Sequence, residues 1–281
     1  MQDPKQQLKK LKYVPRKRLG QNFLIDSSML KRIMDIAEIS NEDVVVEIGA
    51  GLGGLTSYLA RLAREVIALE VDSKLYNYLK ENYGDTANLH ILQEDALKFD
   101  FGQVARKYQS RIKVVANLPY YISSRMVFKL LEARSYISRM VLMLQKEVAV
   151  RIVATPGNKD YGVLSILTQL HTDVSHRLTI PPKSFYPRPR VDSAVVDFKV
   201  LSQPRIELED EDGFGKMVKA AFSRRRKTIG NALQALPEIF REDIPVIFNE
   251  LKIDPRRRGE TLSLEEWGRL SNYLSRRQIY A

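Results

Sequence analysis

Four consecutive residues, Asn117-Leu118-Pro119-Tyr120, combine groups that can hold an amine. The side-chain oxygen of Asn117 and the backbone carbonyl of Leu118 can accept two N–H bonds, and Pro119 fixes the backbone that aims this carbonyl. The exocyclic amine of adenine is a weak nucleophile because its lone pair is delocalised into the ring. Two acceptors that favour a pyramidal nitrogen direct the lone pair at a methyl donor. Residues 117–120 therefore predict methylation of an adenine amine without a strong general base.

Aromatic residues near this strip are candidates for stacking on a base that has left its helix or loop. Tyr120 and Phe185 are the predicted stacking residues. Tyr121 suits a core position and a site position equally. The alternative for residues 117–120 is an ordinary turn after a strand, which their composition also suits. A fitting cofactor motif upstream favours the catalytic interpretation.

That motif is a glycine-rich segment, residues 47–54 (Glu-Ile-Gly-Ala-Gly-Leu-Gly-Gly), which follows a β-branched run and leads into a helical pattern. Its glycines allow a tight turn, and the N-terminus of the helix offers unpaired N–H groups to a ligand. Gly49, Gly51 and Gly54 satisfy the G-x-G-x-x-G spacing, with the acidic Glu70 about 20 residues further on. On spacing alone, the motif suits a nicotinamide dinucleotide, S-adenosylmethionine or a packing turn without a ligand.

Three carboxylates favour S-adenosylmethionine. Glu47 stands two residues before the first glycine, a placement that resembles the methyltransferase signature, in which the acidic group faces the cationic methionine end of the cofactor. Glu70 closes the second predicted strand, where it can accept both ribose hydroxyls. Asp95 follows the third strand, where it can accept from the adenine amino group. Each carboxylate alone could equally cap a surface helix, but together they lie at strand carboxyl ends, where open parallel sheets bind ligands.

Residues that hold metals or disulfides are scarce. The chain has no cysteine, and its 3 histidines, His90, His171 and His176, have no metal-ligand spacing. We expect no catalytic metal and a cytoplasmic location. The N-terminal residues lack the apolar core of a signal peptide. Because no apolar run approaches the roughly 18 residues of a membrane span, we expect no membrane partner.

The formal net charge of +11 favours a polyanionic partner, above all nucleic acid. A protein that is basic only for solubility is the alternative. Clustering argues against it, because basic residues gather within 5–18, 224–227 and 256–258. The predicted RNA-binding residues are Arg224, Arg225, Arg226 and Lys227.

Short β-branched runs alternate with helical patterns from residue 43 onward, which predicts a Rossmann-like α/β fold with a doubly wound, mostly parallel sheet. Strands are expected at 44–48, 66–70, 89–92, 113–116, 140–144, 174–180 and 194–200. Helices are expected at 27–37, 55–62, 74–83, 124–132 and 146–154. The carboxyl ends of the strands would bring the glycine turn, the carboxylates and the 117–120 strip to one edge of the sheet.

Only helical patterns follow residue 201, at 212–222, 227–236, 244–251 and 263–274. They predict a second, smaller, all-helical domain. The expected division is a catalytic, cofactor-binding domain at 1–200 and a helical RNA- or ribosome-binding domain at 201–281, joined by the polar stretch 202–212.

From residue 18 to the C-terminal helices, the chain resembles the small-subunit ribosomal RNA adenine N6,N6-dimethyltransferase family. The similarity begins at residues 19–24 (Leu-Gly-Gln-Asn-Phe-Leu), continues through the motifs above and includes residues 185–195 (Phe-Tyr-Pro-Arg-Pro-Arg-Val-Asp-Ser-Ala-Val). By this resemblance, Asn22 and Leu24 contact the methionine part of the cofactor, and Phe185 lies opposite Tyr120. Tyr121 departs from the Asn that many relatives carry. The expected cofactor-binding residues are Gln21, Asn22, Leu24, Glu47, Gly49, Gly51, Glu70, Val71, Asp95, Ala96 and Asn117.

The resemblance implies an enzyme that uses S-adenosyl-L-methionine, releases S-adenosyl-L-homocysteine and dimethylates N6 of two adjacent adenosines. These would lie in a hairpin near the 3′ end of small-subunit (16S) RNA, in an immature small ribosomal subunit, and the enzyme would act as a monomer. Basic clusters would hold phosphates without reading sequence.

Three alternatives to this function remain open at this stage. The chain could be an assembly or RNA-binding factor with secondary or no methylation. It could be a methyltransferase of large-subunit RNA, which residues 191–195, 224–228 and 258–263 argue against. It could be a nicotinamide oxidoreductase, in which residues 117–120 have no role.

Overall fold

The computed structural model describes residues 4–16, 20–224, 226–234, 236, 239 and 242–277. The chain forms two compact units. Unit 1 comprises Met1–Ala149 and Asp173–Val200, and unit 2 comprises Val150–Thr172 and Leu201–Ala281. Each unit has a hydrophobic cluster of its own.

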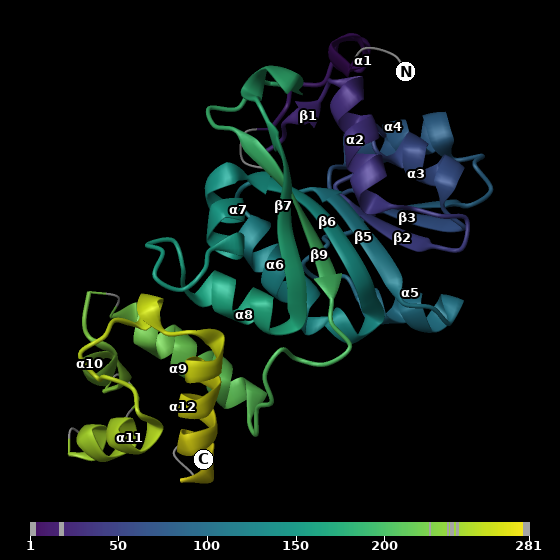
Figure 1. The fold of residues 1–281 in the computed structure, drawn as a ribbon. Coiled ribbons are helices and arrows are strands. Elements are labelled where there is room, and N and C mark those ends of the chain that lie inside the picture. Colours follow the sequence, from purple (N-terminus) through teal and green to yellow (C-terminus); the bar gives the residue numbers. More distant parts are fainter. Residues whose placement is uncertain are drawn as a thin grey trace. The chain divides into compact units, whose positions relative to one another are not determined.

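In the described part of the chain, seven strands form the sheet of unit 1, in the spatial order β4 (Leu89–Leu92), β3 (Glu65–Leu69), β2 (Val44–Ile48), β5 (Ile112–Asn117), β6 (Ile137–Gln145), β9 (Ser193–Val200) and β7 (Thr172–Ile180). The first five of these pair in parallel, and β9 pairs antiparallel with β6. The predicted doubly wound, mostly parallel sheet is confirmed (Figure 1). Chain order reverses between β2 and β5, which creates the topological switch point at which such sheets bind ligands.

The central strands are mostly apolar because helices cover both faces of the sheet. Every residue of β2 is buried. Helices α2 (Ser27–Ala37), α3 (Thr56–Leu62) and α4 (Ser73–Tyr83) lie on one face, and α6 (Ser123–Glu132) lies on the other (Figure 1). The remaining elements are α1 (Pro4–Lys10), α5 (Phe101–Tyr108), α7 (Lys146–Val153) and a small antiparallel pair of β1 (Phe23–Leu24) with β8 (Phe185–Tyr186).

Side chains fix the start of α2, the helix that follows the N-terminal segment. The carboxylate of Asp26 accepts hydrogen bonds from the backbone N–H groups of Ser28 and Met29, at 3.0 and 3.4 Å. Such a cap satisfies helix donors that would otherwise lack a partner. The other oxygen of Asp26 accepts a hydrogen bond from the hydroxyl of Ser184 at 3.2 Å. Because Ser184 directly precedes β8, this cap also ties α2 to the β1–β8 pair.

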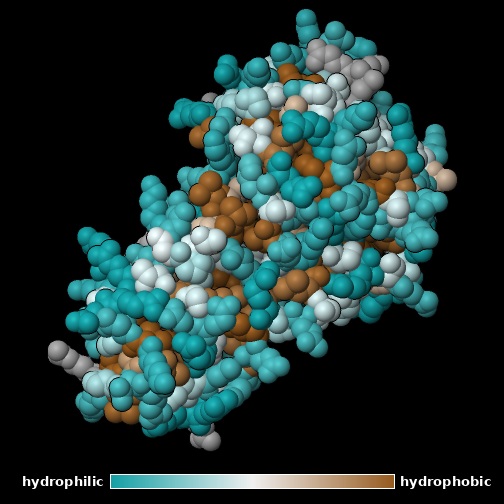
Figure 2. Space-filling model, in the orientation of Figure 1, coloured by the Kyte–Doolittle hydropathy of each residue, from teal (hydrophilic) through white to brown (hydrophobic). Residues whose placement is uncertain are grey.

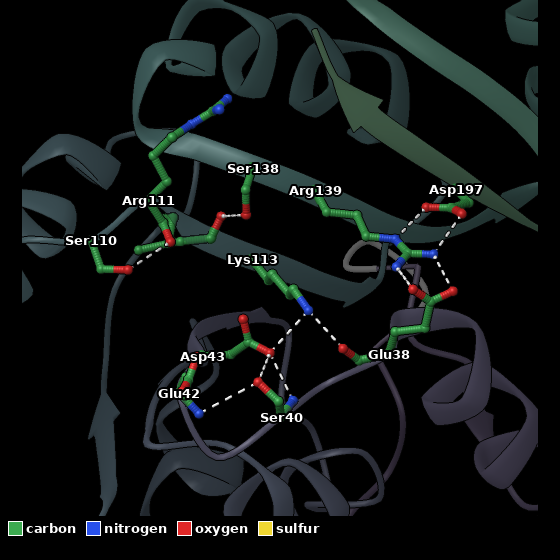
Figure 3. Close-up of polar contacts among 11 residues, drawn as sticks. Glu38, Ser40, Glu42, Asp43, Ser110, Arg111, Lys113, Ser138, Arg139 and Asp197 are labelled. Carbon is green, nitrogen blue, oxygen red and sulfur yellow. Dashed lines mark hydrogen bonds and ion pairs between the residues drawn. The ribbon is translucent and has the colours of Figure 1, made fainter. Parts of the chain in front are cut away.

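The end of α2 is clamped to the sheet by a buried arginine (Figure 3). Arg139 on β6 donates from Nε and Nη2 to the two carboxylate oxygens of Asp197 on β9, both at 2.8 Å, and from Nη1 to Glu38 at 2.7 Å. Lys113 on β5 donates to the backbone carbonyl of Glu38 at 2.6 Å and to Asp43 at 2.9 Å. The hydrogen bond from Arg139 lowers the pKa of the Glu38 carboxyl. Three strands of the sheet therefore hold the segment that ends α2.

Unit 2 is helical, with α8 (Val163–His171), α9 (Glu211–Ser223), α10 (Ile229–Leu233), α11 (Asp243–Leu251) and α12 (Leu264–Arg276). Its cluster is centred on large buried side chains that include Phe214, Phe248 and Trp267, each 0–1% exposed. Ser263 and Glu266 form the capping box that starts α12.

The observed division differs from the expected one at residues 150–172, which were placed in the first domain by the sequence but pack in unit 2. Tyr161, Ile166 and Leu170 belong to the same apolar cluster as Phe214. Helix α8, which the sequence did not predict, buries residues on several sides and therefore lacks a clear one-sided pattern.

The surface drawn in Figure 2 is mostly hydrophilic, and hydrophobic residues show there as separate patches. Among the residues that the structure describes, no helix is both long and apolar enough to cross a membrane.

Candidate active site

A cavity of about 450 Å³ opens at the carboxyl ends of the parallel strands of unit 1. Four adjacent strands contribute to its wall, because it is lined by residues at or just beyond the ends of β2, β3, β4 and β5. This is the edge at the switch point between β2 and β5. Of the predicted site residues, the cavity is lined by Gln21, Asn22, Leu24, Glu47, Gly49, Gly51, Glu70, Val71, Asp95, Ala96, Asn117, Leu118 and Pro119.

The glycine turn after β2 forms the base of this wall. Gly49, Gly51 and Gly53 have positive φ angles of 74°, 59° and 81°, a conformation that favours glycine. A Cβ on Gly53 would also lie 2.6 Å from the ring of Tyr83. A Cβ on Gly54 would meet only ordinary contacts, at 3.8 Å. The third residue that must be glycine is therefore Gly53 rather than the Gly54 of the spacing motif.

Glu70 holds this turn in place and still faces the cavity. Its two carboxylate oxygens accept hydrogen bonds from the backbone N–H groups of Gly51 and Asp72, both at 2.8 Å. The side chain is buried, and burial raises the pKa of the carboxyl. Because a carboxylate has about four acceptor positions, Glu70 can accept from ligand hydroxyls while keeping both backbone contacts. The contact with Gly51 gives Glu70 a second, structural role that its sequence position did not indicate.

Glu47 is a buried carboxylate on the cavity wall, 1% exposed. Within the described residues, its Oε2 atom has no hydrogen-bond partner. Burial, together with the nearby charge of Glu70, raises the pKa of the Glu47 carboxyl to about 7. A buried carboxylate with an unpaired oxygen is stabilised by a cation. This observation fits the predicted position of the methionine end of the cofactor.

The wall beyond β3 and β4 combines apolar surface with hydrogen-bond acceptors. Val71 is 50% exposed and lines the cavity together with the buried Ala96. Asp95 accepts a hydrogen bond from the backbone N–H of Leu97 at 3.0 Å. Apolar contact flanked by a carboxylate suits a flat ring with an amino group.

The 117–120 strip is fixed by contacts with distant segments. The side-chain nitrogen of Asn117 donates to the backbone carbonyl of Asn22 at 3.0 Å. The backbone N–H of Leu118 donates to the carbonyl of Met143 on β6 at 3.0 Å, and the Leu118 side chain is buried. With its nitrogen committed to Asn22, Asn117 offers its amide oxygen as the acceptor. Asn117 lines the cavity, and its contact with Asn22 was not predicted from the sequence.

The two predicted stacking residues, Tyr120 and Phe185, are not among the residues that line the cavity. The hydroxyl of Tyr120 pairs with that of Ser193 at 2.9 Å, which fixes the orientation of its ring. Phe185 is 3% exposed and packs in the hydrophobic cluster with Leu24, its partner across the β1–β8 pair. A stacking role for these two residues stays a prediction. Tyr121, by contrast, lines the cavity and is 55% exposed.

The sequence prediction missed the part that the N-terminal helix plays in this cavity. Pro4 and Gln7 of α1 line it. The side-chain oxygen of Gln21 accepts from the hydroxyl of Tyr13 at 2.9 Å and from the backbone N–H of Arg16 at 2.8 Å. Gln21 thus ties the segment after α1 to the cavity. In the sequence, the apolar Leu8 and the aromatic Tyr13 within an otherwise basic N-terminus could have indicated that this segment packs against the protein. Both side chains are buried in the structure.

The predicted RNA-binding residues lie in unit 2. Arg224, Arg226 and Lys227 are exposed, and Arg225 lies outside the described residues. In the neighbouring cluster at 256–258, Arg257 is not available in the same way, because it forms a bidentate pair with Glu266 at 2.6 and 2.9 Å. Within the residues that the structure describes, no group of three or more His, Cys, Asp or Glu could hold a metal ion.

A glycine turn after the first strand of a parallel sheet, with carboxylates after the next two strands, is the arrangement of Rossmann-like class I methyltransferases. Residues 14–276 match the family described as Ribosomal RNA adenine dimethylase, and the chain belongs to this family. Membership confirms both the resemblance found in the sequence and the predicted enzyme class.

Relatives and solved structures agree with this family. The chain is 45% identical over 273 residues to Ribosomal RNA small subunit methyltransferase A of Geobacillus sp. (strain WCH70), covering 95% of this chain and 94% of that protein. A protein of the same name from Geobacter sulfurreducens is 45% identical over 92% of this chain and 95% of its own length. A dimethyladenosine transferase from Plasmodium falciparum has a TM-score of 0.78 at 27% identity, covering 90% of this chain and 98% of that one. The 23S rRNA methyltransferase ErmE has a TM-score of 0.69 at 26% identity, covering 90% and 99%.

Proposed function

We propose that this protein transfers methyl groups from S-adenosylmethionine to N6 of two adjacent adenosines in a hairpin near the 3′ end of small-subunit ribosomal RNA. The product is N6,N6-dimethyladenosine. One observation carries the proposal: the anchored Asn117 presents its amide oxygen at the cavity that Glu47, Glu70 and Asp95 also line. Small-subunit methyltransferases that are 41–45% identical to this chain support the choice of polymer.

The cavity residues fit the proposed cofactor at each of its parts. Glu70 would accept from the ribose hydroxyls, and Asp95 would accept from the adenine amine beside the apolar wall of Val71 and Ala96. Glu47, with its unpaired buried oxygen, would face the cationic methionine end. When bound, S-adenosylmethionine would supply an electrophilic methyl carbon, so that the N–C bond forms as the C–S bond breaks, S-adenosylhomocysteine is released, and the proton of the methylated amine passes to water.

The protein groups at the amine act by orientation. The side-chain oxygen of Asn117 and the carbonyl of Leu118 accept the two N–H bonds, which favours a pyramidal nitrogen with its lone pair directed at the methyl carbon. A monomethylated amine keeps one N–H for one of these acceptors, so the same strip serves both transfers. No side chain has to act as a strong base.

The proposed partner is the immature small ribosomal subunit, bound in the cytoplasm by one copy of the protein. Exposed Arg224, Arg226 and Lys227 would contact phosphates, and so would Arg225 by its place in the sequence. Phosphate contacts orient the RNA and leave the choice of base to the cavity.

Substitution of Asn117 by Ala tests the proposal directly. We expect methyl transfer to fall by about 10² to 10³, the range found when one oriented hydrogen-bonding group is removed from an active site. Affinity for RNA should change little. The matched control is Asn82→Ala, which removes an exposed amide on α4. Retention of transfer in Asn117→Ala would contradict the assigned role.

The substrate is tested by incubating the wild-type protein with both ribosomal RNAs and isotopically labelled S-adenosylmethionine, followed by mass mapping. Label at adjacent adenosines of the small-subunit RNA is the expected result. Label confined to large-subunit RNA would favour the activity of the structurally similar ErmE. Binding to the small subunit without label would indicate an assembly factor, and calorimetric preference for a nicotinamide dinucleotide would overturn the cofactor.

A further inference from the structure

Tyr121 and Arg125 form a rim on the cavity that none of the cofactor contacts uses. Both residues line the cavity, beside Pro119 and Ile122. Tyr121 lies in the turn that follows the 117–120 strip, and Arg125 lies in the first turn of α6. The rim therefore starts where the proposed amine-binding strip ends.

The ring of Tyr121 lies close to Gly20 and is partly exposed to solvent. A Cβ on Gly20 would lie 3.4 Å from Cδ1 of Tyr121 and 3.3 Å from the backbone nitrogen of Tyr120, so the absence of a side chain at Gly20 makes room for the ring. The positive φ of Gly20, 58°, is a second reason for glycine there. About half of Tyr121, 55%, nevertheless stays exposed. An aromatic ring held in this way is a ready stacking surface.

Arg125 supplies positive charge on the wall of the same cavity. It is exposed, and it has no carboxylate partner in the part of the chain that the structure describes. The first turn of α6 contains no acidic residue. Its charge is therefore available to an anion, and a nucleic acid backbone offers one phosphate per nucleotide.

We propose that Tyr121 and Arg125 form a subsite for the nucleotide next to the target adenosine, with Tyr121 stacking on its base and Arg125 contacting its phosphate. The inference rests on the proposed function, because it requires an adenosine held at Asn117. When that adenosine leaves its stack, the neighbouring base loses a stacking partner, and the exposed ring of Tyr121 replaces it. Stacking on a ring does not depend on sequence, so the subsite serves either of two adjacent adenosines as the other is methylated.

The test is a double-mutant cycle between the protein and the RNA. Tyr121→Ala, Tyr121→Phe and Arg125→Gln are assayed with a hairpin RNA carrying two adjacent adenosines and with hairpins in which the base on one side of the target is absent. We expect Tyr121→Ala to raise KM for the intact hairpin about tenfold or more, the effect of losing one stacked base, with kcat little changed. Tyr121→Phe should restore KM, because it keeps the ring.

The stacking contact is identified by comparing the effect of Tyr121→Ala on KM between the intact hairpin and the hairpin that lacks the neighbouring base. Tyr121→Ala should have almost no effect on the hairpin whose neighbouring base is already absent. Arg125→Gln should raise KM for every hairpin alike and reduce its dependence on salt. The control is Tyr108→Ala, because Tyr108, the last residue of α5, has its ring centroid 4.7 Å from Nζ of Lys107 and does not line the cavity.

The outcomes separate this inference from the proposed function. If the wild type methylates the hairpin but Tyr121→Ala matches it in KM, the subsite is wrong and the function stands. An equal loss with intact and abasic hairpins, or a weaker affinity of Tyr121→Ala for S-adenosylmethionine measured by calorimetry, would also overturn the subsite. If the wild type transfers no methyl group to any RNA, the proposed function itself fails.

Discussion

At the scale of single residues, Glu47 shows how burial prepares a group for a ligand. A carboxylate that is removed from water and left with an unpaired oxygen disfavours its own charge, so burial raises its pKa to about 7. A cation beside it would reverse that preference and lower the pKa. Binding of the proposed cofactor and loss of the Glu47 proton are therefore coupled.

This coupling predicts a pH dependence of cofactor affinity. We expect S-adenosylmethionine to bind about tenfold more tightly at about pH 8 than at about pH 6, with proton release, because ionised Glu47 is the form that binds the cation. Calorimetry in buffers of different ionisation enthalpy measures both quantities. Glu47→Gln should remove the dependence. An identical pH profile in wild type and Glu47→Gln would show that another group is responsible.

The same pKa shift affects the protein without ligand. The pKa of Glu47 in the folded state lies above its ordinary value. The contribution of this carboxyl group to the free energy of unfolding is therefore fully present below the ordinary pKa and is lost as the pH rises through about 7. The carboxylate therefore opposes folding near neutral pH, where Glu47→Gln should be more stable than the wild type. Such a cost at a binding site is expected where a ligand later compensates it.

At the scale of elements, α2 follows the segment at residues 20–24, which contacts the 117–120 strip. Asn22 lies directly before β1, the strand that precedes α2, and its backbone carbonyl accepts the hydrogen bond that orients Asn117. The position of α2 is set at its other end by Arg139, which holds Glu38 and Asp197 together (Figure 3). A network far from the cavity thus contributes to the orientation of the strip.

Two substitutions on the same arginine should have unequal effects. Asp197→Ala leaves Arg139 buried without its main partner, and we expect a loss of about 3–5 kcal/mol in the free energy of unfolding of unit 1. Glu38→Ala removes a carboxylate that is 61% exposed, so the loss should stay below about 1 kcal/mol. Hydrogen exchange at the amides of β6 measures the stability of unit 1. Tryptophan fluorescence would not, because the only tryptophan, Trp267, lies in unit 2. Equal losses would argue against the network.

At the scale of the whole molecule, the net charge of +11 sets the interaction with RNA. The basic residues are not equivalent, however. Arg257 is committed to Glu266, whereas Arg224, Arg226 and Lys227 are exposed. Cations that are already paired contribute less to the release of counterions from RNA.

Charge reversal at Arg224 and Arg226 should therefore weaken RNA binding and reduce its salt dependence. Each lost phosphate contact should lower the slope of log K against log salt by about 0.7 to 0.9. Reversal of the exposed Arg61 and Lys107, which lie in unit 1, is the matched control and should change the slope less. A slope that is the same for wild type and the Arg224 and Arg226 variant would assign this cluster to solvation alone.

The sequence by itself determined the sheet and the residues at its ligand-binding edge. The strand at Val44–Ile48 agrees with the structure at both ends, because a parallel strand covered on both faces is a mostly apolar run, here interrupted only by Glu47 at the cavity. The glycine turn, Glu70, Asp95 and Asn117 were found because strand carboxyl ends are readable from local pattern. The eight-residue α5 was not predicted from the sequence.

Only the tertiary structure decided which distant groups meet. Asn22 and Asn117 are 95 residues apart, Gly53 must be glycine because of the ring of Tyr83, and Phe185 packs in the core where the sequence predicted a stacking residue. Tyr121, which suited a core position and a site position equally, is exposed at the cavity. Local pattern records which face of an element is apolar, but contacts between elements depend on how those faces pack together.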